Sequence, residues 1–245
     1  MDMQNRTLRP PQLDDRLEAA IAMAAPCRVG ADIGADHGKL SAALLMRGLC
    51  EHMLVSDISD KALSKARILL GNLRLSDRAD FAAADGLSAM ASGRQKADTC
   101  FILGMGGETM AHILLDGQHV LSGAKLILSP QTDVPLVRQA LCQIGYRLRR
   151  EEIVFSSGRD YILMRAEPAV QDEPGYTDKE LLLGPILLKE CPAQWESYLR
   201  REEQYVKKAI TAMEKASSFK DMERLAQFRE TLSLVQEALD FYREE

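Results

Sequence analysis

The segment with the clearest chemical character is Asp32-Ile33-Gly34-Ala35-Asp36-His37-Gly38, which follows a short apolar run. Gly34 would let the backbone turn sharply at the end of a strand, and Gly38 would let the following helix pack closely. Dinucleotide-binding loops have a glycine where this chain has Asp36, and a carboxylate there repels a diphosphate. Asp32 and Asp36 instead favour a ligand with sulfonium and ammonium charges, although both could simply belong to an ordinary strand-to-helix turn.

The ends of three further predicted strands carry residues that fit such a ligand. Asp57, followed by Ile58, closes the second strand, where a carboxylate can accept both hydroxyls of a ribose. Asp85-Gly86 closes the third, where an acidic side chain can bind an adenine amino group. Gly104-Met105-Gly106-Gly107 follows the fourth and would bring the backbone close to a bound molecule. Each aspartate could instead cap a helix, but the succession favours an S-adenosylmethionine site.

Alternating strands and helices must position these loops. Apolar runs predict strands at residues 27–33, 52–56, 79–84, 97–103 and 125–128. Helical spacing predicts helices at residues 13–25, 37–48, 59–73, 108–115 and 134–144. Repeated strand–helix units of this kind form a parallel sheet with right-handed crossovers.

Two more predicted strands, at residues 147–155 and 160–166, flank the turn residues Ser156-Ser157-Gly158. Strands joined by so short a link must be antiparallel. A terminal hairpin added to a parallel sheet is typical of the seven-stranded, Rossmann-like methyltransferase fold of the α/β class. Plain dinucleotide-binding domains usually lack this hairpin, which makes a nicotinamide-dependent dehydrogenase a weak alternative.

The composition changes after Pro168, where the polar stretch 169–180 predicts a linker or loop. We therefore expect a methyltransferase domain at residues 1–168 and a C-terminal helical domain at residues 169–245.

Two long helices are predicted in that tail, at residues 194–216 and 220–242, joined at Ser217-Ser218 as an antiparallel coiled-coil hairpin. The second carries an apolar stripe with three- and four-residue steps, formed by Leu225, Phe228, Leu232, Val235 and Leu239. The hairpin could be a packing or oligomerisation element, or it could clamp a substrate beside the active site. The stripe leaves monomer and dimer both open.

The composition limits the partners and the compartment. The net charge of -5 argues against a general affinity for nucleic acid, so an RNA partner would need a local basic patch. No apolar run is long enough to cross a membrane, and the first residues lack the apolar core of a signal peptide, which predicts a cytoplasmic protein without a membrane partner. Five scattered cysteines predict free or buried thiols and no metal site. They are Cys27, Cys50, Cys100, Cys142 and Cys191.

Five segments are distinctive in combination, namely ADIGADHGKL, ADGL, ILGMGGE, LILSPQTD and GYRLRREEIVFSSGRDYILM. They resemble the bacterial tRNA (adenine-22 N1)-methyltransferase family, often called TrmK. The resemblance covers residues 13–168 and continues through LGPILLKE into the helical tail. It implies a class I fold, S-adenosylmethionine as the methyl donor, the D-arm region of tRNA as substrate, and a coiled-coil tail that helps to dock the tRNA. The chain departs from the family at Ser129 and Gln131, where members often have Gln and Asn.

The resemblance also implies a set of site residues by position. Those beside the donor are Asp32, Gly34, Asp36, His37, Asp57, Ile58, Asp85, Gly86, Gly104, Met105, Gly106 and Gly107. Adenine N1 is a lone-pair nucleophile with no proton to remove, so alignment carries much of the catalysis. Asp36 is a candidate for stabilising the cationic product. His37 could contact the donor or the base, or only cap the helix.

The target adenine must leave its stack, because N1 lies on the pairing edge of the base. Met105, Phe155 and Tyr161 are the nearest candidate contacts, although we expect Phe155 to be a core residue. Seven basic side chains could contact tRNA, and each could equally be a solvated surface charge. They are Arg6, Arg9, Lys39, Arg147, Arg149, Arg150 and Arg159.

Two other functions remain open at this stage. An enzyme with the same donor could methylate another RNA base, a protein or a small molecule, and the sheet motifs do not distinguish these acceptors. A non-catalytic RNA-binding protein could also retain this fold, although the intact acidic and glycine positions argue against a degenerate site. Donor affinity separates the enzymes from the non-catalytic protein.

Overall fold

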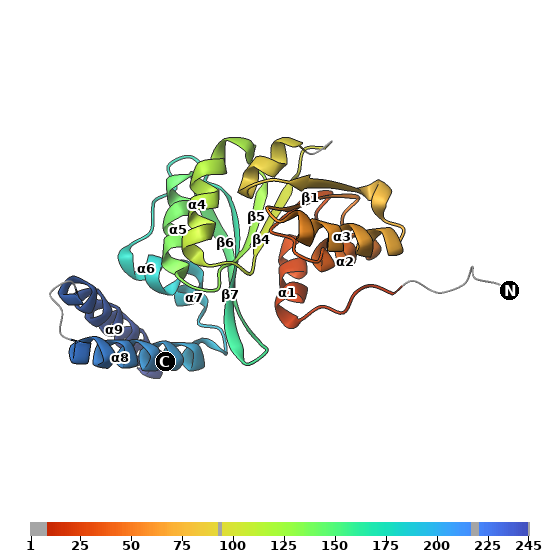
Figure 1. The fold of residues 1–245 in the computed structure, drawn as a ribbon. Helices are drawn as coiled ribbons and strands as arrows, with labels where there is room; N and C mark the ends of the chain where they lie inside the picture. The colour runs from red at the N-terminus through yellow and green to blue at the C-terminus, as the bar shows by residue number, and fades with distance from the viewer. Residues whose placement is uncertain (1–8, 93–94, 217–220, 245) are drawn as a thin grey trace.

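The computed structural model describes residues 9–92, 95–216 and 221–244. Its centre is a seven-stranded sheet in the order β3-β2-β1-β4-β5-β7-β6, with helices on both faces (Figure 1). The strands are β1 (Val29–Ile33), β2 (His52–Asp57), β3 (Ala79–Ala83), β4 (Thr99–Leu103), β5 (Lys125–Ser129), β6 (Tyr146–Ser156) and β7 (Arg159–Pro168). Strands β1 to β5 are parallel, and β7 runs antiparallel to β5 and β6. The predicted sheet and its terminal hairpin are confirmed.

The helices alternate with the strands as the sequence predicts, with ends that shift by a few residues. They are α1 (Asp15–Ala24), α2 (Lys39–Met46), α3 (Asp60–Asn72), α4 (Gly107–Gly117), α5 (Val134–Gln143), α6 (Asp178–Leu183), α7 (Pro185–Glu190), α8 (Trp195–Ala216) and α9 (Asp221–Glu244). Short 3₁₀ turns lie at Ser76–Arg78, Gly86–Ser92 and Gln118–Val120. Helix α3 has an N-terminal cap, because the Ser59 side chain accepts a hydrogen bond from the Ala62 amide at 3.3 Å.

Both faces of the sheet are buried, because successive strand residues point to opposite sides. In β4, Cys100 and Ile102 pack in the cluster that contains α4 and α5, whereas Phe101 packs in the cluster that contains α1, α2 and α3. Two covered faces explain why the parallel strands are continuous apolar runs rather than alternating ones. The strand order reverses between β1 and β4, and this reversal places a crevice at their carboxyl ends.

One core prediction is wrong, because Phe155 is 58% exposed. The strands of the β6–β7 hairpin are longer than their neighbour β5. Strand β5 pairs with β7 only at residues 164–166 of β7. Phe155 pairs with Asp160 near the end of the hairpin, which projects past the sheet in Figure 1. An apolar residue near a hairpin end therefore need not be covered.

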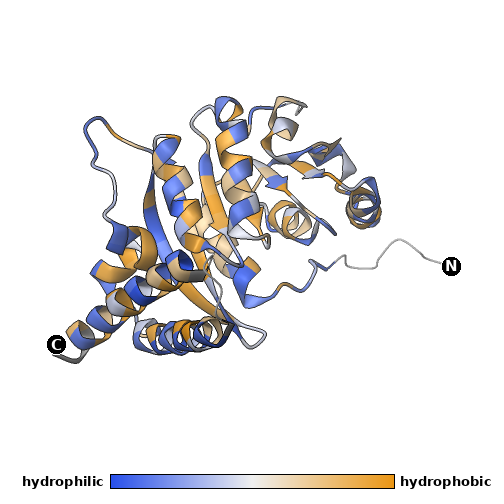
Figure 2. Ribbon diagram, turned by 60° about the vertical axis from the view of Figure 1, so that its left-hand side comes forward, coloured by the Kyte–Doolittle hydropathy of each residue, from blue (hydrophilic) through white to orange (hydrophobic). Residues whose placement is uncertain are grey.

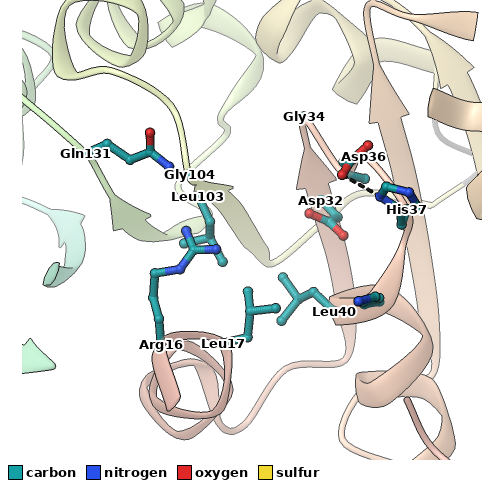
Figure 3. A pocket seen from close by; sticks show the side chains of 12 residues that line it. Arg16, Leu17, Asp32, Gly34, Asp36, His37, Leu40, Leu103, Gly104 and Gln131 are labelled. Atoms are coloured by element: carbon teal, nitrogen blue, oxygen red, sulfur yellow. Dashed lines mark hydrogen bonds and ion pairs between the residues drawn. The ribbon is translucent and has the colours of Figure 1, made fainter. Parts of the chain in front are cut away.

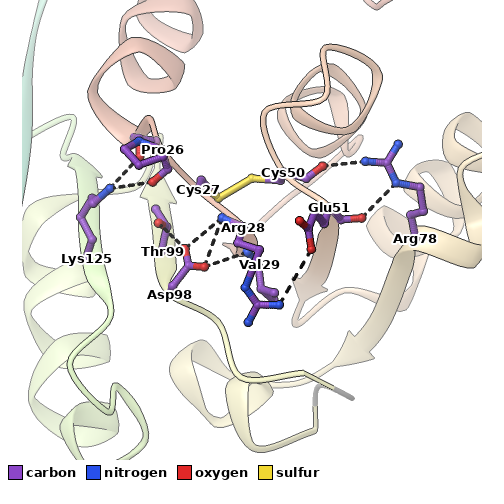
Figure 4. Close-up of a disulfide and its surroundings, with 11 residues drawn as sticks. Pro26, Cys27, Arg28, Val29, Cys50, Glu51, Arg78, Asp98, Thr99 and Lys125 are labelled. Atoms are coloured by element: carbon purple, nitrogen blue, oxygen red, sulfur yellow. Dashed lines mark hydrogen bonds and ion pairs between the residues drawn. A yellow bond between two sulfur atoms is a disulfide. The ribbon is translucent and has the colours of Figure 1, made fainter.

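The cysteine prediction is wrong for one pair, because Cys27 and Cys50 form a disulfide with Cα atoms 5.2 Å apart (Figure 4). Each residue lies two positions before its strand, and β1 and β2 pair in a register that places Val29 opposite His52. The parallel pairing therefore brings the two side chains together from 23 residues apart. The other three cysteines, Cys100, Cys142 and Cys191, are not part of a disulfide.

The segment after β7 is fastened to the sheet rather than free. The Arg147 guanidinium is buried and donates hydrogen bonds to the carbonyls of Pro174 and Glu173, at 2.8 and 3.2 Å. The Tyr176 hydroxyl accepts a hydrogen bond from the Leu148 amide at 2.8 Å. These bonds fix the path of the chain from the sheet into α6.

A buried ion pair then connects the sheet to α6 and α7. Arg138 on α5 donates through Nε and Nη2 to Glu151 on β6, both at 2.9 Å, and the two side chains are 1% and 0% exposed. Arg138 Nη1 also donates to the carbonyls of Leu181 and Leu182, and Glu151 accepts from the Ile186 amide at 3.0 Å. Because every charged group here has hydrogen-bond partners, the network fixes α5, β6, α6 and α7 in one arrangement.

The long helices α8 and α9 pair as predicted, and Figure 1 shows them beside the hairpin. Trp195, Val235 and Leu239 are buried in the same cluster as α4 and α5, so the apolar stripe of α9 continues into the core of the sheet. Hydropathy colouring shows apolar and polar positions interleaved along both helices (Figure 2). The predicted junction at Ser217-Ser218 lies outside the described residues, and the division of the chain at residue 168 stays a prediction. No helix in the described ranges is long and apolar enough to span a membrane.

Replacing Arg138 with methionine should lower the free energy of unfolding by about 3–5 kcal/mol, because the Glu151 carboxylate would remain buried without its partner. Replacing both residues with apolar ones should restore most of that loss. Urea denaturation of the wild type, the single variant and the double variant measures the free energy of unfolding. The exposed Arg200–Glu196 pair provides the control, since Arg200→Met should cost less than about 1 kcal/mol. A loss of under 1 kcal/mol for Arg138→Met would contradict the structural role of this network.

Candidate functional site

A pocket of about 270 Å³ lies over the carboxyl ends of β1 and β4, where the strand order reverses. Five predicted site residues meet in it, from β1, the loop that follows β1, and the end of β4. They are Asp32, Gly34, Asp36, His37 and Gly104. The remaining wall comes from α1, α2 and the loop after β5, and Figure 3 shows these side chains converging on one space.

Asp32 is the most constrained charged group in the pocket. It lies in the central strand β1, is 5% exposed, and accepts a hydrogen bond from the Ser41 hydroxyl at 2.7 Å. Burial raises the pKa of its carboxyl group to about 6, against the opposing effect of the Ser41 bond. A cation beside Asp32 would offset the cost of this buried charge.

The loop after β1 is held by hydrogen bonds to the neighbouring strand. Asp36 has a positive φ of 46°, and its amide donates to the Asp57 carboxylate at 3.1 Å. Asp57 also accepts from the Ser59 amide at 2.8 Å. The Asp36 carboxylate lies 2.5 Å from Nδ1 of His37, whose Nε2 lies 3.1 Å from Lys65 Nζ. His37 is thus held between an acid and a base on the surface.

The glycine-rich segment after β4 forms backbone hydrogen bonds with the loop after β5. The amide of Gly104 donates to Ser129, that of Gly107 donates to Thr132, and the Met105 carbonyl accepts from Gln131, all at 2.9–3.0 Å. A Cβ on Gly107 would lie 2.3 Å from the Thr132 carbonyl oxygen. Gly107 is therefore needed where these two loops cross, and the approach of a bound molecule to this segment stays a prediction.

The Met105 side chain links this loop to the one after β1. A Cβ on Gly34 would lie 2.8 Å from Met105 Cε, so Gly34 leaves room for that side chain as well as making a turn at a φ of 74°. Gly106 borders the same crossing, because a Cβ there would lie 3.4 Å from the Thr132 hydroxyl. Gly38 contributes to packing as predicted: a Cβ there would lie 2.9 Å from Ala66 on α3.

The other predicted residues lie along the same edge of the sheet but outside this pocket. Asp85 and Gly86 line a second pocket of about 500 Å³ against α4, beside Thr109 and His112. Asp57 ends β2 between the two loops, and Ile58 beside it is 73% exposed. The order along the edge is therefore Asp85 after β3, Asp57 at β2, and the first pocket at β1 and β4.

Several pocket residues were not predicted as donor contacts from the sequence. They are Arg16, Leu17, Ala35, Lys39, Leu40, Leu103 and Gln131. Lys39 was expected only as a tRNA contact, and Arg16 belongs to no motif in the sequence. The helical spacing of α1 gives no sign that its first turn closes a site formed by distant strands. Gln131 could have been identified, because it follows a strand that adjoins the predicted crevice.

The basic residues proposed from the sequence as tRNA contacts are mostly engaged within the protein. Arg147 is buried as described above, Arg149 pairs with Glu173, and Arg150 pairs with Glu152. The two carboxylates offset the repulsion between the neighbouring guanidinium groups of Arg149 and Arg150. Arg9 and Arg159 are exposed, whereas Arg6 lies outside the described residues.

The comparisons with known proteins agree with this geometry. The family model for TrmK, tRNA (adenine(22)-N(1))-methyltransferase, matches residues 30–237. The tRNA (adenine(22)-N(1))-methyltransferase of Bacillus subtilis (strain 168) is 27% identical over 235 residues, which are 94% of this chain and 98% of that protein.

Solved structures give the same result. The crystal structure of the B. subtilis m1A22 tRNA methyltransferase TrmK superposes with a TM-score of 0.82 at 26% identity, covering 93% of this chain and 99% of that one. A Streptococcus pneumoniae protein, solved in complex with S-adenosyl-L-methionine, superposes at 0.81 with 22% identity over 93% and 100% of the two chains, a likeness of fold. With the family model spanning most of its length, this chain belongs to the TrmK family of tRNA (adenine(22)-N(1))-methyltransferases.

Proposed function

We propose that this chain transfers a methyl group from S-adenosylmethionine to N1 of adenine 22 in the D-arm region of tRNA, and that the pocket over β1 and β4 holds the reacting end of the donor. The observation that carries the donor site is the buried Asp32 carboxylate. It faces a pocket open to a ligand while burial raises its pKa to about 6. A ligand that brings a positive charge close to Asp32 would offset the cost of this buried carboxylate. S-Adenosylmethionine carries two such charges, on its ammonium and sulfonium groups.

The order of acidic residues along the sheet edge supports one orientation of the donor. The adenine would lie toward Asp85, and the ribose hydroxyls toward Asp57, whose oxygens can each accept a further hydrogen bond. The exposed Ile58 side chain would cover one face of the adenine ring. The methionine part would then reach the first pocket, beside Asp32 and the loop at Gly34.

The residues of the pocket are suited to alignment rather than to proton transfer. The bound donor supplies a methyl group on a sulfonium sulfur, and adenine N1 has a free lone pair, so no general base is needed. Met105 and the crossed loops would exclude water and orient the base. The Asp36 carboxylate and the carbonyl of Gly104 would stabilise the positive charge on the methylated adenine. His37 would help to fix Asp36 through their hydrogen bond.

A tRNA substrate has consequences for the compartment of the protein and for the surface that contacts it. Because tRNA is its substrate, we place the protein in the cytoplasm. Three exposed cations could meet the tRNA backbone, namely Lys39 in the lining of the pocket, Arg9 before α1 and Arg159 on the β6–β7 hairpin. The paired helices α8 and α9 lie beside that hairpin, where the Arg201 side chain pairs with Asp160. This ion pair holds the start of α8 against the hairpin, where the tail would clamp the substrate.

Replacing Asp32 with asparagine should weaken donor binding by at least about tenfold at pH 7.5, because a charge-assisted contact is lost. The same change should stabilise the ligand-free protein by up to about 3 kcal/mol at that pH, because the wild-type group is ionised against a pKa raised to about 6. Calorimetry with the donor and urea denaturation measure the two effects.

The pH dependence follows from the raised pKa of Asp32. The wild-type protein should lose stability as the pH rises from about 4 to about 6, and Asp32→Asn should remove that loss. Donor affinity of the wild type should fall below about pH 6, where the carboxyl group takes up a proton, and the variant should not show that fall. Asp36 is an exposed carboxylate close to Asp32, so Asp36→Asn serves as the control for stability. This change should alter the free energy of unfolding by less than about 1 kcal/mol. Undiminished donor affinity in Asp32→Asn would overturn this donor site.

The acceptor is tested with labelled donor and unmodified bacterial tRNA carrying adenine at position 22. We expect transfer to this tRNA, 1-methyladenosine in its nuclease digest, and no transfer to a matched tRNA with guanine 22. A tRNA that keeps adenine 22 but has a disrupted D-stem should be methylated poorly. Equal labelling of the guanine 22 tRNA, or a different methylated base, would refute the acceptor and leave the donor site intact.

A further inference from the structure

Arg16 lies in the first turn of α1 and reaches the end of β4. The preceding Asp14 caps the helix by accepting from the Leu17 amide at 2.8 Å, and this cap fixes the turn. The Arg16 side chain is 16% exposed, and its guanidinium lies over the Tyr161 ring, 5.2 Å from the ring centroid. A Cβ on Gly104 would lie 3.0 Å from Arg16 Nη1, so the absence of a side chain there leaves room for the guanidinium.

The guanidinium has donors that the described part of the chain does not use. Nη1 is buried and makes no hydrogen bond to any described residue. Nη2 lies 4.0 Å from the Asp14 carboxylate, an ion-pair distance that is too long for a hydrogen bond. A buried charged donor of this kind is costly unless an acceptor binds to it. Arg16 lines the first pocket, so an acceptor there can be a ligand.

The two sides of the pocket carry opposite charges. Figure 3 shows Arg16 entering from α1 on one side and Asp32 from β1 on the other. The methionine part of the donor carries an ammonium and a carboxylate on one carbon atom, so it needs an anion and a cation close together. Asp32 suits the ammonium, and a second carboxylate beside Asp32 or Asp36 would be repelled.

Among the cationic side chains of the lining, Arg16 suits a carboxylate best. His37 is already engaged by Asp36 and Lys65. Lys39 is an exposed point charge in water. A guanidinium that is already held over an aromatic ring presents two parallel donors that match a carboxylate.

On the basis of the proposed function, we infer that Arg16 binds the α-carboxylate of the donor and thereby selects molecules that have an intact amino-acid end. Asp32 and Arg16 together would recognise both charges of that end. S-Adenosylhomocysteine has the same two charges, so it would bind at the same positions and inhibit the enzyme. Decarboxylated S-adenosylmethionine lacks the carboxylate and would not use Arg16.

The test compares two ligands, S-adenosylmethionine and its decarboxylated form, by calorimetry on the full chain. Arg16→Gln should weaken binding of the intact donor about tenfold to a hundredfold and change binding of the decarboxylated form by less than about twofold. Arg16→Lys keeps the charge but loses the paired donors, so it should give a smaller loss with the same dependence on the carboxylate. Melting temperatures verify that each variant is folded.

Two control variants remove a positive charge elsewhere. Arg47 pairs with Glu18 of α1 through two hydrogen bonds but does not line the pocket, so Arg47→Gln should affect both ligands equally and little. Lys39→Gln tests the rival cation in the lining. The inference is overturned if Arg16→Gln weakens both ligands equally or neither, or if Lys39→Gln shows the carboxylate-dependent loss instead. If the wild type itself binds no donor, the proposed function fails as well.

Discussion

A carboxylate held out of water at the end of a central strand is the feature on which this site depends. Asp32 is buried because β1 lies in the middle of a sheet that helices cover on both faces. The Ser41 hydroxyl satisfies only part of its hydrogen-bonding capacity, and burial still raises the pKa of the group. The protein thus retains a destabilising charge that a cationic ligand would offset, and this cost is typical of a binding site rather than of packing.

Rigid surroundings keep this charge facing the crevice. The loops after β4 and β5 are crossed by backbone hydrogen bonds that require glycine at position 107, and the loop after β1 is bonded to Asp57 on β2. On the far side of the sheet, the buried Arg138–Glu151 network attaches α6 and α7 to the same framework. The paired tail helices therefore extend from a fixed base beside the hairpin.

Local patterns in the sequence were sufficient to predict the alternating elements, the hairpin, and the acidic residues at the strand ends, because each depends on neighbouring residues. The features that were missed depend on contacts between distant segments. Arg16 lies in a helix whose pattern indicates only packing, and Cys27 meets Cys50 only through the register of two parallel strands. Phe155 is exposed because the β6–β7 hairpin extends beyond the neighbouring strand β5. Strand propensity does not predict how far a hairpin extends past its neighbour.

The most direct test of the central claim is a crystal structure of this chain with S-adenosylhomocysteine. The account predicts that the adenine lies toward Asp85, the ribose hydroxyls on Asp57, and the amino-acid end in the pocket between Asp32 and Arg16. A complex in which the ligand occupies the crevice in the opposite direction, with its adenine over β4, would contradict the account. So would a ligand bound away from the carboxyl ends of β1 and β4.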